Sequence, residues 1–271
     1  MKKNYSKKQN ILLFILLFIL FCSSVYGEEK IVVAATLYDY PPFCFYKDNP
    51  SKEPVETIPP GFDSNKLQGY SWDIFRLCMH EMGYTIKLKV YPWARAEAIT
   101  KNGEADILFP TGKNAEREKI YQYSKKYLNK ANFLVYILKD SPIVWNDINP
   151  LKGLVVGLMR GWNYGDKWES YIKNFKQHQL NTIMQGFKLL DIKRINGFAG
   201  YEINCDYNLM KLGWKNKYKK LPSFDYTTEY PVGLKNNVHI TKIIDDFDKG
   251  MKQIIQNGKF DIIKKKWLGE N

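Results

Sequence analysis

The sequence is poor in the residues that build metal and redox sites. It has three histidines and four cysteines in 271 residues. His80, His178 and His239 lack the spacing of a metal site or a catalytic triad, and no CxxC pair occurs. We therefore expect no metal and no cofactor, and we interpret the histidines as structural or surface residues. The sequence also lacks low-complexity tracts and short-period repeats.

Long apolar runs are rare too, and the one that occurs lies near the N-terminus. Four lysines precede it, residues 11–21 are wholly apolar, and Gly27 ends a stretch of small or polar residues. This order is typical of a secretory signal, and a bilayer span takes about 20 residues. We expect cleavage after Gly27, with a permanent membrane anchor as the alternative. Phe21 before Cys22 disfavours a lipid anchor, so the expected product is a soluble periplasmic protein.

Acidic residues are outnumbered by basic ones. The chain has 28 Asp and Glu against 41 Lys and Arg, which gives a formal net charge of +13. Removal of the signal with its four lysines would leave +9. A basic chain suggests nucleic-acid binding, but export argues against it, and the lysines are scattered. We interpret the charge as a solvated surface that can also attract anionic ligands.

Three cysteines remain after the predicted cleavage: Cys44, Cys78 and Cys205. An oxidising compartment permits one disulfide among them and leaves one thiol. Buried free thiols are at least as well supported, because the spacing favours no particular pair. The sequence leaves both possibilities open.

Strand patterns and helix patterns alternate along the chain. Apolar, β-branched or alternating runs predict strands, and apolar residues at three- and four-residue steps predict helices. The expected strands span residues 31–36, 84–90, 105–109, 133–138, 154–159, 197–201 and 230–234. The expected helices span residues 71–82, 93–102, 166–175, 187–194, 204–212 and 240–255, followed by a terminal helix that bears Phe260, Ile263 and Trp267. This alternation predicts an α/β fold around a largely parallel sheet.

The mature chain is long enough for one large domain or for two smaller lobes that each bury a core. We expect lobe I to comprise residues 28–136 and 228–271. Lobe II, residues 137–227, would be inserted into it. The segments near 134–141 and 224–232 would be the two crossovers between the lobes.

Short motifs occur in a characteristic order over nearly the whole mature sequence. They are DYPPF at 39–43, GYSWDI at 69–74, NGEAD at 102–106, ER at 116–117, YS at 123–124, LKG at 151–153, VG at 156–157, NGKFD at 257–261 and KWLG at 266–269. Through this ordered set the chain resembles the bacterial extracellular solute-binding proteins of family 3, the polar amino-acid-binding class of ABC transporters. The resemblance implies a two-lobed periplasmic-binding-protein-like fold of type II. Its lobes are joined by two hinge segments and enclose a ligand.

The resemblance also implies a ligand site in lobe I. Arg117 matches the arginine that holds the ligand α-carboxylate, and a guanidinium can bind a carboxylate through two parallel hydrogen bonds. A surface salt bridge is the alternative for Arg117. Thr111 and Gly112 lie where family members offer hydroxyl and backbone NH groups, in a loop one residue shorter here. Tyr40 matches an aromatic residue that packs on the ligand, and Trp93 is a second candidate wall; a core role is the alternative for both.

Another candidate in lobe I is Arg95, which would bind a second anionic group unless it is a solvated helix charge. In lobe II, Arg160, Gly161 and Trp162 lie in a turn before a predicted helix. Exposed NH groups at a helix start suit an anion. The bulk of Trp162 suggests a more aromatic wall than family members usually have.

The position after strand 197–201 departs from the family pattern. Amino-acid binders usually have an Asp there that pairs with the ligand ammonium, whereas this chain has Tyr201 followed by Glu202. Glu202 substitutes for it only if the loop shifts by one residue. A ligand with a carboxylate and little positive charge is therefore a plausible alternative to an amino acid.

The sequence thus predicts a monomeric, exported protein that captures a small polar, carboxylate-bearing solute, an amino acid or a relative of one. Its partner would be a membrane ABC permease, and we expect it to bind no nucleic acid. We expect no enzymatic activity. One alternative is a periplasmic enzyme that resembles cyclohexadienyl dehydratase, for which Glu202 is the nominated acid or base. The other is a ligand-sensing protein that engages a receptor.

Overall fold

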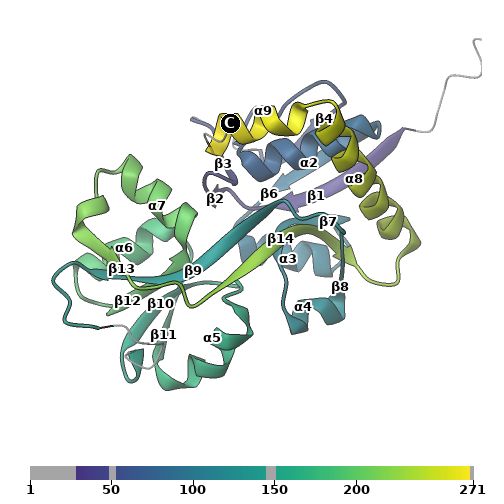
Figure 1. Ribbon diagram of the computed structural model, residues 1–271. Helices are drawn as coiled ribbons and strands as arrows, with labels where there is room; N and C mark the ends of the chain where they lie inside the picture. Colours follow the sequence, from purple (N-terminus) through teal and green to yellow (C-terminus); the bar gives the residue numbers. More distant parts are fainter. Residues whose placement is uncertain (1–28, 49–52, 145–150, 269–271) are drawn as a thin grey trace, which may run out of the picture. The chain divides into compact units, whose positions relative to one another are not determined.

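Among the residues that the structure describes, eleven strands form one mixed sheet and three strands form a second sheet. The computed structural model describes residues 29–48, 53–144 and 151–268 (Figure 1). The predicted signal peptide and its cleavage site at Gly27 lie outside these residues. Residues 31–271 form one unit, and the contacts given below lie within it. In the described part of the chain, no helix is both long enough and apolar enough to cross a membrane.

The chain up to residue 123 builds one side of the large sheet and all of the small one. Its elements are β1 (Lys30–Thr36), β2 (Asp39–Tyr40), β3 (Cys44–Tyr46), β4 (Val55–Ile58), β5 (Leu67–Gln68), α2 (Tyr70–Glu81), β6 (Tyr84–Val90), α3 (Trp93–Lys101), β7 (Ile107–Gly112), α4 (Ala115–Ile120) and β8 (Tyr121–Tyr123).

The rest of the chain leaves this side of the sheet and later returns to it. Its elements are β9 (Asn129–Leu138), β10 (Val155–Met159), α5 (Gly165–Tyr171), the 3₁₀ turn η2 (Ile172–Asn174), β11 (Lys176–Leu180), α6 (Ile183–Asp191), β12 (Gly197–Tyr201), α7 (Glu202–Lys211), η3 (Lys215–Lys217), β13 (Tyr218–Lys220), β14 (Asp225–Leu234), α8 (Val238–Gln256) and α9 (Lys259–Leu268).

The strand order of the large sheet is β11-β10-β12-β9-β14-β7-β1-β6-β4. β1 pairs in parallel with β7, and β10 pairs in parallel with both β11 and β12. β9 and β14 run antiparallel to each other and to their outer neighbours β12 and β7. At one edge, β4 also pairs antiparallel with β6. The sheet is therefore mixed, and the expectation of a largely parallel sheet holds only for the pairings of β1 with β7 and of β10 with β11 and β12.

The central pair joins two groups of elements. We call β1 to β8 with α2, α3, α4, α8 and α9 the first group, and β10 to β13 with α5 to α7 the second group. β9 and β14 pair from Asn129 with Glu229 to Phe133 with Asp225. The two strands overlap the expected crossover segments 134–141 and 224–232. Figure 1 shows them as the two long strands that connect both groups.

Helix α8 packs against the rest of the fold through an apolar stripe on one of its faces. Its buried apolar side chains recur at three- and four-residue steps, which place them on one face. They are Ile240, Ile243, Ile244, Phe247, Met251 and Ile254. α8 packs against α2, and at Gly250 the two backbones nearly touch. A Cβ at Gly250 would lie 2.2 Å from the carbonyl oxygen of Cys78, so a side chain does not fit there.

Several elements differ from expectation, and two of them do so because their residues lack an apolar pattern. β11 was not expected: residues 176–179 are exposed and polar, and only Leu180 is buried. A polar strand at a sheet edge is stabilised by its backbone pairing with β10 instead. β14 begins at Asp225, five residues before the expected start at Tyr230, because its first half alternates polar side chains.

The three cysteines in the described chain are buried, free thiols. Cys44 lies on β3, Cys78 on α2 and Cys205 on α7. The structure therefore answers the question that the spacing left open, in favour of thiols rather than a disulfide. Burial raises the pKa of each thiol above its usual value, so they remain protonated and unreactive.

Replacement of Gly250 by alanine tests the close approach of α8 to α2. Helix propensity alone predicts that Gly→Ala stabilises a helix by about 1 kcal/mol. We expect the opposite, a loss of roughly 1–3 kcal/mol, because the new methyl group would collide with the Cys78 carbonyl. Chemical denaturation measures the change. Asp245→Ala, at an exposed position of the same helix, is the control. A Gly250→Ala protein as stable as the control would contradict this packing.

Candidate functional site

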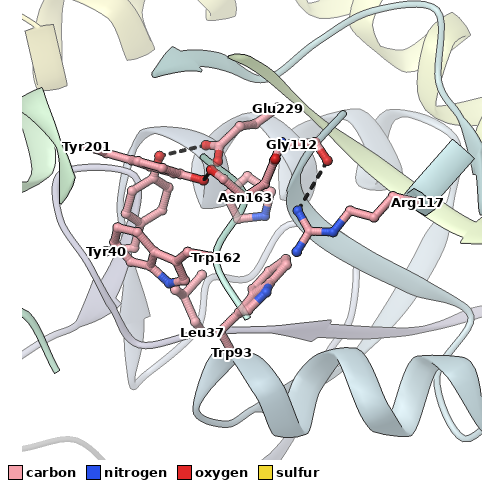
Figure 2. A pocket seen from close by; sticks show the side chains of 10 residues that line it. Leu37, Tyr40, Trp93, Gly112, Arg117, Trp162, Asn163, Tyr201 and Glu229 are labelled. Atoms are coloured by element: carbon pink, nitrogen blue, oxygen red, sulfur yellow. Dashed lines mark hydrogen bonds between the residues drawn. The ribbon is translucent and has the colours of Figure 1, made fainter. Parts of the chain in front are cut away.

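A pocket lies where strand ends and turns from both groups meet (Figure 2). Its lining residues are Leu37, Tyr40, Trp93, Pro110, Gly112, Arg117, Trp162, Asn163, Tyr201 and Glu229. They come from six regions of the chain: the end of β1 with β2, the start of α3, β7 with α4, the turn after β10, the end of β12, and β14. The remaining cavity is about 10 Å³, room for about one water. The protein's own side chains therefore fill most of the pocket.

Arg117 lies in this lining and is 7 % exposed. Helix α4 carries it, and the side chain of Asn114 caps that helix by accepting a hydrogen bond from the Arg117 backbone NH (2.8 Å). The guanidinium donates from Nη1 to the Gly112 carbonyl (3.2 Å) and from Nη2 to the Gly161 carbonyl (2.8 Å). Its Nε lies 3.5 Å from a Glu97 carboxylate oxygen. The cation is thus held in one orientation by acceptors on three sides.

The turn after β10, residues 160–164, reaches into the pocket from the second group. Gly161 has a φ of +72°, a left-handed conformation that favours glycine. Its carbonyl accepts hydrogen bonds from Arg117 Nη2 and from Trp93 Nε1 (2.9 Å). Asn163 donates from Nδ2 to the Lys113 carbonyl (3.0 Å). These hydrogen bonds tie this turn to the first group.

The expected anion site at the start of α5 is filled by the chain itself. Asn163 Oδ1 accepts a hydrogen bond from the backbone NH of Gly165, at 2.9 Å. It also accepts one from Asn114 Nδ2, at 3.2 Å. The amide oxygen thus takes the place at the helix start that an anion would occupy.

Three aromatic rings form one wall of the pocket. The ring centroids are 5.4 Å apart for Tyr40 and Trp162, 4.5 Å for Trp162 and Tyr201, and 5.7 Å for Tyr40 and Tyr201. Tyr40 belongs to the first group, whereas Trp162 and Tyr201 belong to the second. The Tyr201 hydroxyl donates to the Asn163 carbonyl at 2.5 Å. The wall is therefore a packed cluster that spans both groups.

Glu229 is the carboxylate in the lining and is 3 % exposed. Its Oε2 accepts hydrogen bonds from the Tyr40 hydroxyl (2.7 Å) and from Asn129 Nδ2 (2.5 Å). Asn129 Oδ1 in turn accepts one from the Ser71 hydroxyl (2.7 Å). Burial raises the pKa of Glu229 to about 7, although these hydrogen bonds and the nearby Arg117 lower it. Its charge therefore changes within the physiological pH range.

The structure brings six of the predicted residues together: Tyr40, Trp93, Gly112, Arg117, Trp162 and Tyr201 all line the pocket. Gly161 contacts Arg117 through its carbonyl. Arg160 lines an adjoining cavity of about 40 Å³ instead. Thr111 is buried, and its hydroxyl donates to the Leu108 carbonyl (3.2 Å). Arg95 is exposed, with its guanidinium 4.2 Å from the centre of the Tyr91 ring.

Glu202 lies outside the lining, although Tyr201 beside it is in the lining. Lys220 Nζ donates to one of its carboxylate oxygens (2.7 Å) and Asn132 Nδ2 to the other (3.3 Å). The Lys220 hydrogen bond lowers the pKa of Glu202. Its predicted contact with the ligand stays a prediction, and no contact with the pocket supports it.

Sequence reasoning missed four lining residues: Leu37, Pro110, Asn163 and Glu229. Glu229 had a usable signal. In the alternation of β14 it falls on the same face as Thr227 and Pro231, and all three are buried. A carboxylate on the inward face of a strand is a strong sign of a site. Among the described residues, no cluster of three or more His, Cys, Asp or Glu is arranged to hold a metal ion.

Asp39 forms a further contact between the two groups. Its Oδ2 accepts a hydrogen bond from the backbone NH of Ile183 (3.2 Å), at the start of α6. Burial raises the pKa of Asp39 to about 6, and the Ile183 hydrogen bond lowers it by a smaller amount. Nearby, Asn204 Nδ2 donates to the Pro41 carbonyl (2.8 Å). Contacts between the groups therefore continue beyond the pocket lining.

Comparison with known proteins gives a consistent result. The profile of the bacterial extracellular solute-binding proteins, family 3, matches residues 32–270. The chain is 23% identical over 256 residues to the arginine-binding extracellular protein ArtP of Bacillus subtilis (strain 168), which covers 89% of this chain and 87% of ArtP.

Solved structures share the fold at low sequence identity. The arginine-, lysine-, histidine-binding protein ArtJ of Geobacillus stearothermophilus aligns with a TM-score of 0.71 and 20% identity, over 89% of this chain and 96% of that one. A histidine kinase sensor domain with similarity to periplasmic binding proteins aligns with a TM-score of 0.73 and 18% identity, over 89% and 96%. The mixed α/β fold is therefore that of periplasmic binding proteins.

Replacement of Asp39 by asparagine tests the contact with α6. Because burial raises its pKa, the ionised Asp39 destabilises the fold above pH 6, and the penalty disappears as the pH falls towards 4. Asparagine keeps an acceptor for Ile183 and removes the charge. We expect Asp39→Asn to be more stable than wild type by roughly 1–3 kcal/mol at pH 8 and equal to it near pH 4. Melting curves at several pH values measure this, with Asp166→Asn, at an exposed position, as the control. A variant less stable than wild type at pH 8 would contradict it.

Proposed function

Because the chain belongs to the bacterial extracellular solute-binding proteins of family 3, we propose that it captures a small, carboxylate-bearing solute for uptake by a membrane ABC permease. The solute is an amino acid or a close relative of one. Family membership supplies the general solute-binding function. The class of solute and the coupling to a permease are our proposal.

The observation that carries the proposal is the setting of Arg117. A buried guanidinium lines the pocket, and its Nη2 donates to a carbonyl oxygen of the second group, that of Gly161. A ligand carboxylate would take the place of this oxygen, since an ionised acceptor binds a guanidinium more strongly than a neutral one. Trp93 Nε1, which shares the Gly161 oxygen, would then be a second donor to the ligand.

Ligand entry requires the two groups to separate, because the cavity of about 10 Å³ cannot hold an amino acid. We propose that residues 28–136 with 228–271 form lobe I and residues 137–227 form lobe II. β9 and β14 would be the hinge segments, since they alone connect the two groups in the sheet order. The hydrogen bonds of Gly161, Asn163, Asp39 and Asn204 between the groups would break together when the lobes open and form again when they close.

We place the mature protein in the periplasm, as a monomer that diffuses to its permease. The support is the charged and apolar pattern of the first 27 residues together with the family's extracellular location. ArtP, the relative from Bacillus subtilis, is likewise named an extracellular protein.

Truncation of Arg117 tests the proposed carboxylate contact. We expect Arg117→Ala to weaken the binding of the best solute by about 2–5 kcal/mol, because a buried, hydrogen-bonded charge pair loses one partner. Arg117→Lys keeps the charge but not the planar donor pair, so we expect it to recover only part of the loss. Wild type is first screened by thermal shift against amino acids, keto acids and small dicarboxylates. Calorimetry then gives the affinities.

The exposed Arg194 provides a matched control, Arg194→Ala, and should bind as wild type does. Melting curves check that each variant is folded. Unchanged affinity in Arg117→Ala would overturn the assignment of the carboxylate site. Turnover of prephenate or arogenate by the wild-type protein would overturn the transport function in favour of the dehydratase alternative.

A further inference from the structure

We infer that Glu229 binds the ammonium group of the solute, so that the ligand is a zwitterionic amino acid held between Arg117 and Glu229. The inference rests on the proposed function and narrows it. It also assigns the amine contact to β14. Amino-acid binders of the family usually have an Asp for this contact after strand 197–201, where this chain has Tyr201 and Glu202.

The first argument is position. Glu229 lies on β14, where it is paired with Gly112 of β7 on one side and with Asn129 of β9 on the other. Gly112 accepts a hydrogen bond from Arg117, so the two charged residues approach the same strand end. Both side chains line the pocket, and Figure 2 shows them on either side of Asn163. A ligand that displaces the 160–164 turn would meet both.

The second argument is the arrangement of hydrogen bonds. Tyr40 and Asn129 both donate to Oε2 of Glu229, and Ser71 fixes the orientation of the Asn129 amide. Among the described residues, no hydrogen bond ends on Oε1 of Glu229. The network therefore holds the carboxylate rigidly by one oxygen and leaves the other for a donor in the pocket. An ammonium is such a donor, with three N–H groups.

The third argument is charge. The titratable or charged groups that face Glu229 are Arg117 from α4, Tyr40 from β2, Tyr201 from β12 and Cys44 from β3. Arg117 is the one cation among these described groups, and its Nε already lies near Glu97. If a solute carboxylate pairs with Arg117, that cation no longer balances Glu229, and Glu229 becomes a buried anion without a counter-charge. Such a group is costly unless the same solute supplies a cation.

Protonation supports the same assignment. Burial raises the pKa of Glu229 to about 7, so the side chain is about half ionised near neutral pH. An ammonium binds only the ionised form. Solute binding should therefore remove the proton from Glu229, and affinity should fall as the pH drops through 7.

The experiment uses the standard L-amino acids and, for each, the 2-hydroxy acid in which a hydroxyl replaces the amine. Calorimetry is done with wild type and Glu229→Gln. The glutamine retains an oxygen for Tyr40 and Asn129 and removes the charge. We expect wild type to prefer its best amino acid over the hydroxy acid by roughly thirtyfold or more, as a buried charge pair implies. Glu229→Gln should lose most of that preference while hydroxy-acid binding changes little.

A pH series on wild type gives a second readout that needs no variant. Affinity for the amino acid should fall about tenfold between pH 8 and pH 6, since a pKa of about 7 leaves about a tenth of Glu229 ionised at pH 6. Affinity for the hydroxy acid should stay level or rise. Glu169→Gln is the matched control: burial also raises the pKa of Glu169, which lies on α5 outside the pocket lining.

The outcomes separate this inference from the proposed function. If Glu229→Gln keeps the amino-acid preference, or the wild-type affinity for the amino acid does not change with pH, the ammonium assignment is wrong. The carboxylate site at Arg117 then stands or falls by its own variants. If wild type binds hydroxy acids as tightly as amino acids, the ligand is not selected by its amine and the inference is again overturned. If no probe binds, both the inference and the proposed amino-acid function fail.

Discussion

The antiparallel pairing of β9 with β14 is the constraint on which the rest of the fold depends. β12 pairs with the outer side of β9 and β7 with the outer side of β14, so both groups of elements are built onto this one pair. The register places Asn129 opposite Glu229. Because side chains alternate along a strand, a slip of one residue would turn Glu229 away from the pocket. The strands that join the groups therefore also fix the carboxylate of the site.

The two charges of the pocket are buried in different ways. Arg117 is surrounded by acceptors: two backbone carbonyls and, less closely, the Glu97 carboxylate. Glu229 is held by two neutral donors, the Tyr40 hydroxyl and the Asn129 amide. Burial disfavours the ionised form of a carboxylate that is hydrogen-bonded to neutral donors, and it raises the pKa of Glu229 to about 7. The site therefore combines the Arg117 guanidinium with a titratable anion.

Local patterns in the sequence predict the elements whose burial is periodic. The stripe of α8 and the apolar run of β12 are examples, and the observed bounds of β12 equal the expected ones. Elements stabilised by distant partners are not predictable in this way. β11 has no buried face of its own apart from Leu180 and exists through its pairing with β10. The mixed character of the sheet likewise depends on which strands pair with each other. A local sequence pattern does not predict these partners.

The same distinction applies to the site. Arg117 is predictable because a short motif carries it. The aromatic wall is predictable because its residues lie at or just after strand ends: Tyr40 ends β2, Tyr201 ends β12 and Trp162 follows β10. Glu229 has one local signal, the alternation of β14, but its hydrogen-bond partners are distant: Tyr40 is 189 positions away in the chain and Asn129 is 100 positions away. Glu202 differs from Tyr201 by one position. Because Glu202 is the first residue of α7, its carboxylate lies next to Lys220 and not in the pocket.

The Gly161 carbonyl has a consequence for which solutes the site can select. A solute that offers Arg117 a neutral oxygen would exchange one carbonyl-like acceptor for another and gain almost nothing from the swap. A carboxylate gains the difference between a charged and a neutral acceptor. An incoming group would therefore gain free energy at Arg117 only if it accepts a stronger hydrogen bond than the Gly161 oxygen does. With Arg117 in its proposed role, uncharged sugars and amides would gain nothing from this exchange, and the protein's own main chain would discriminate against neutral solutes.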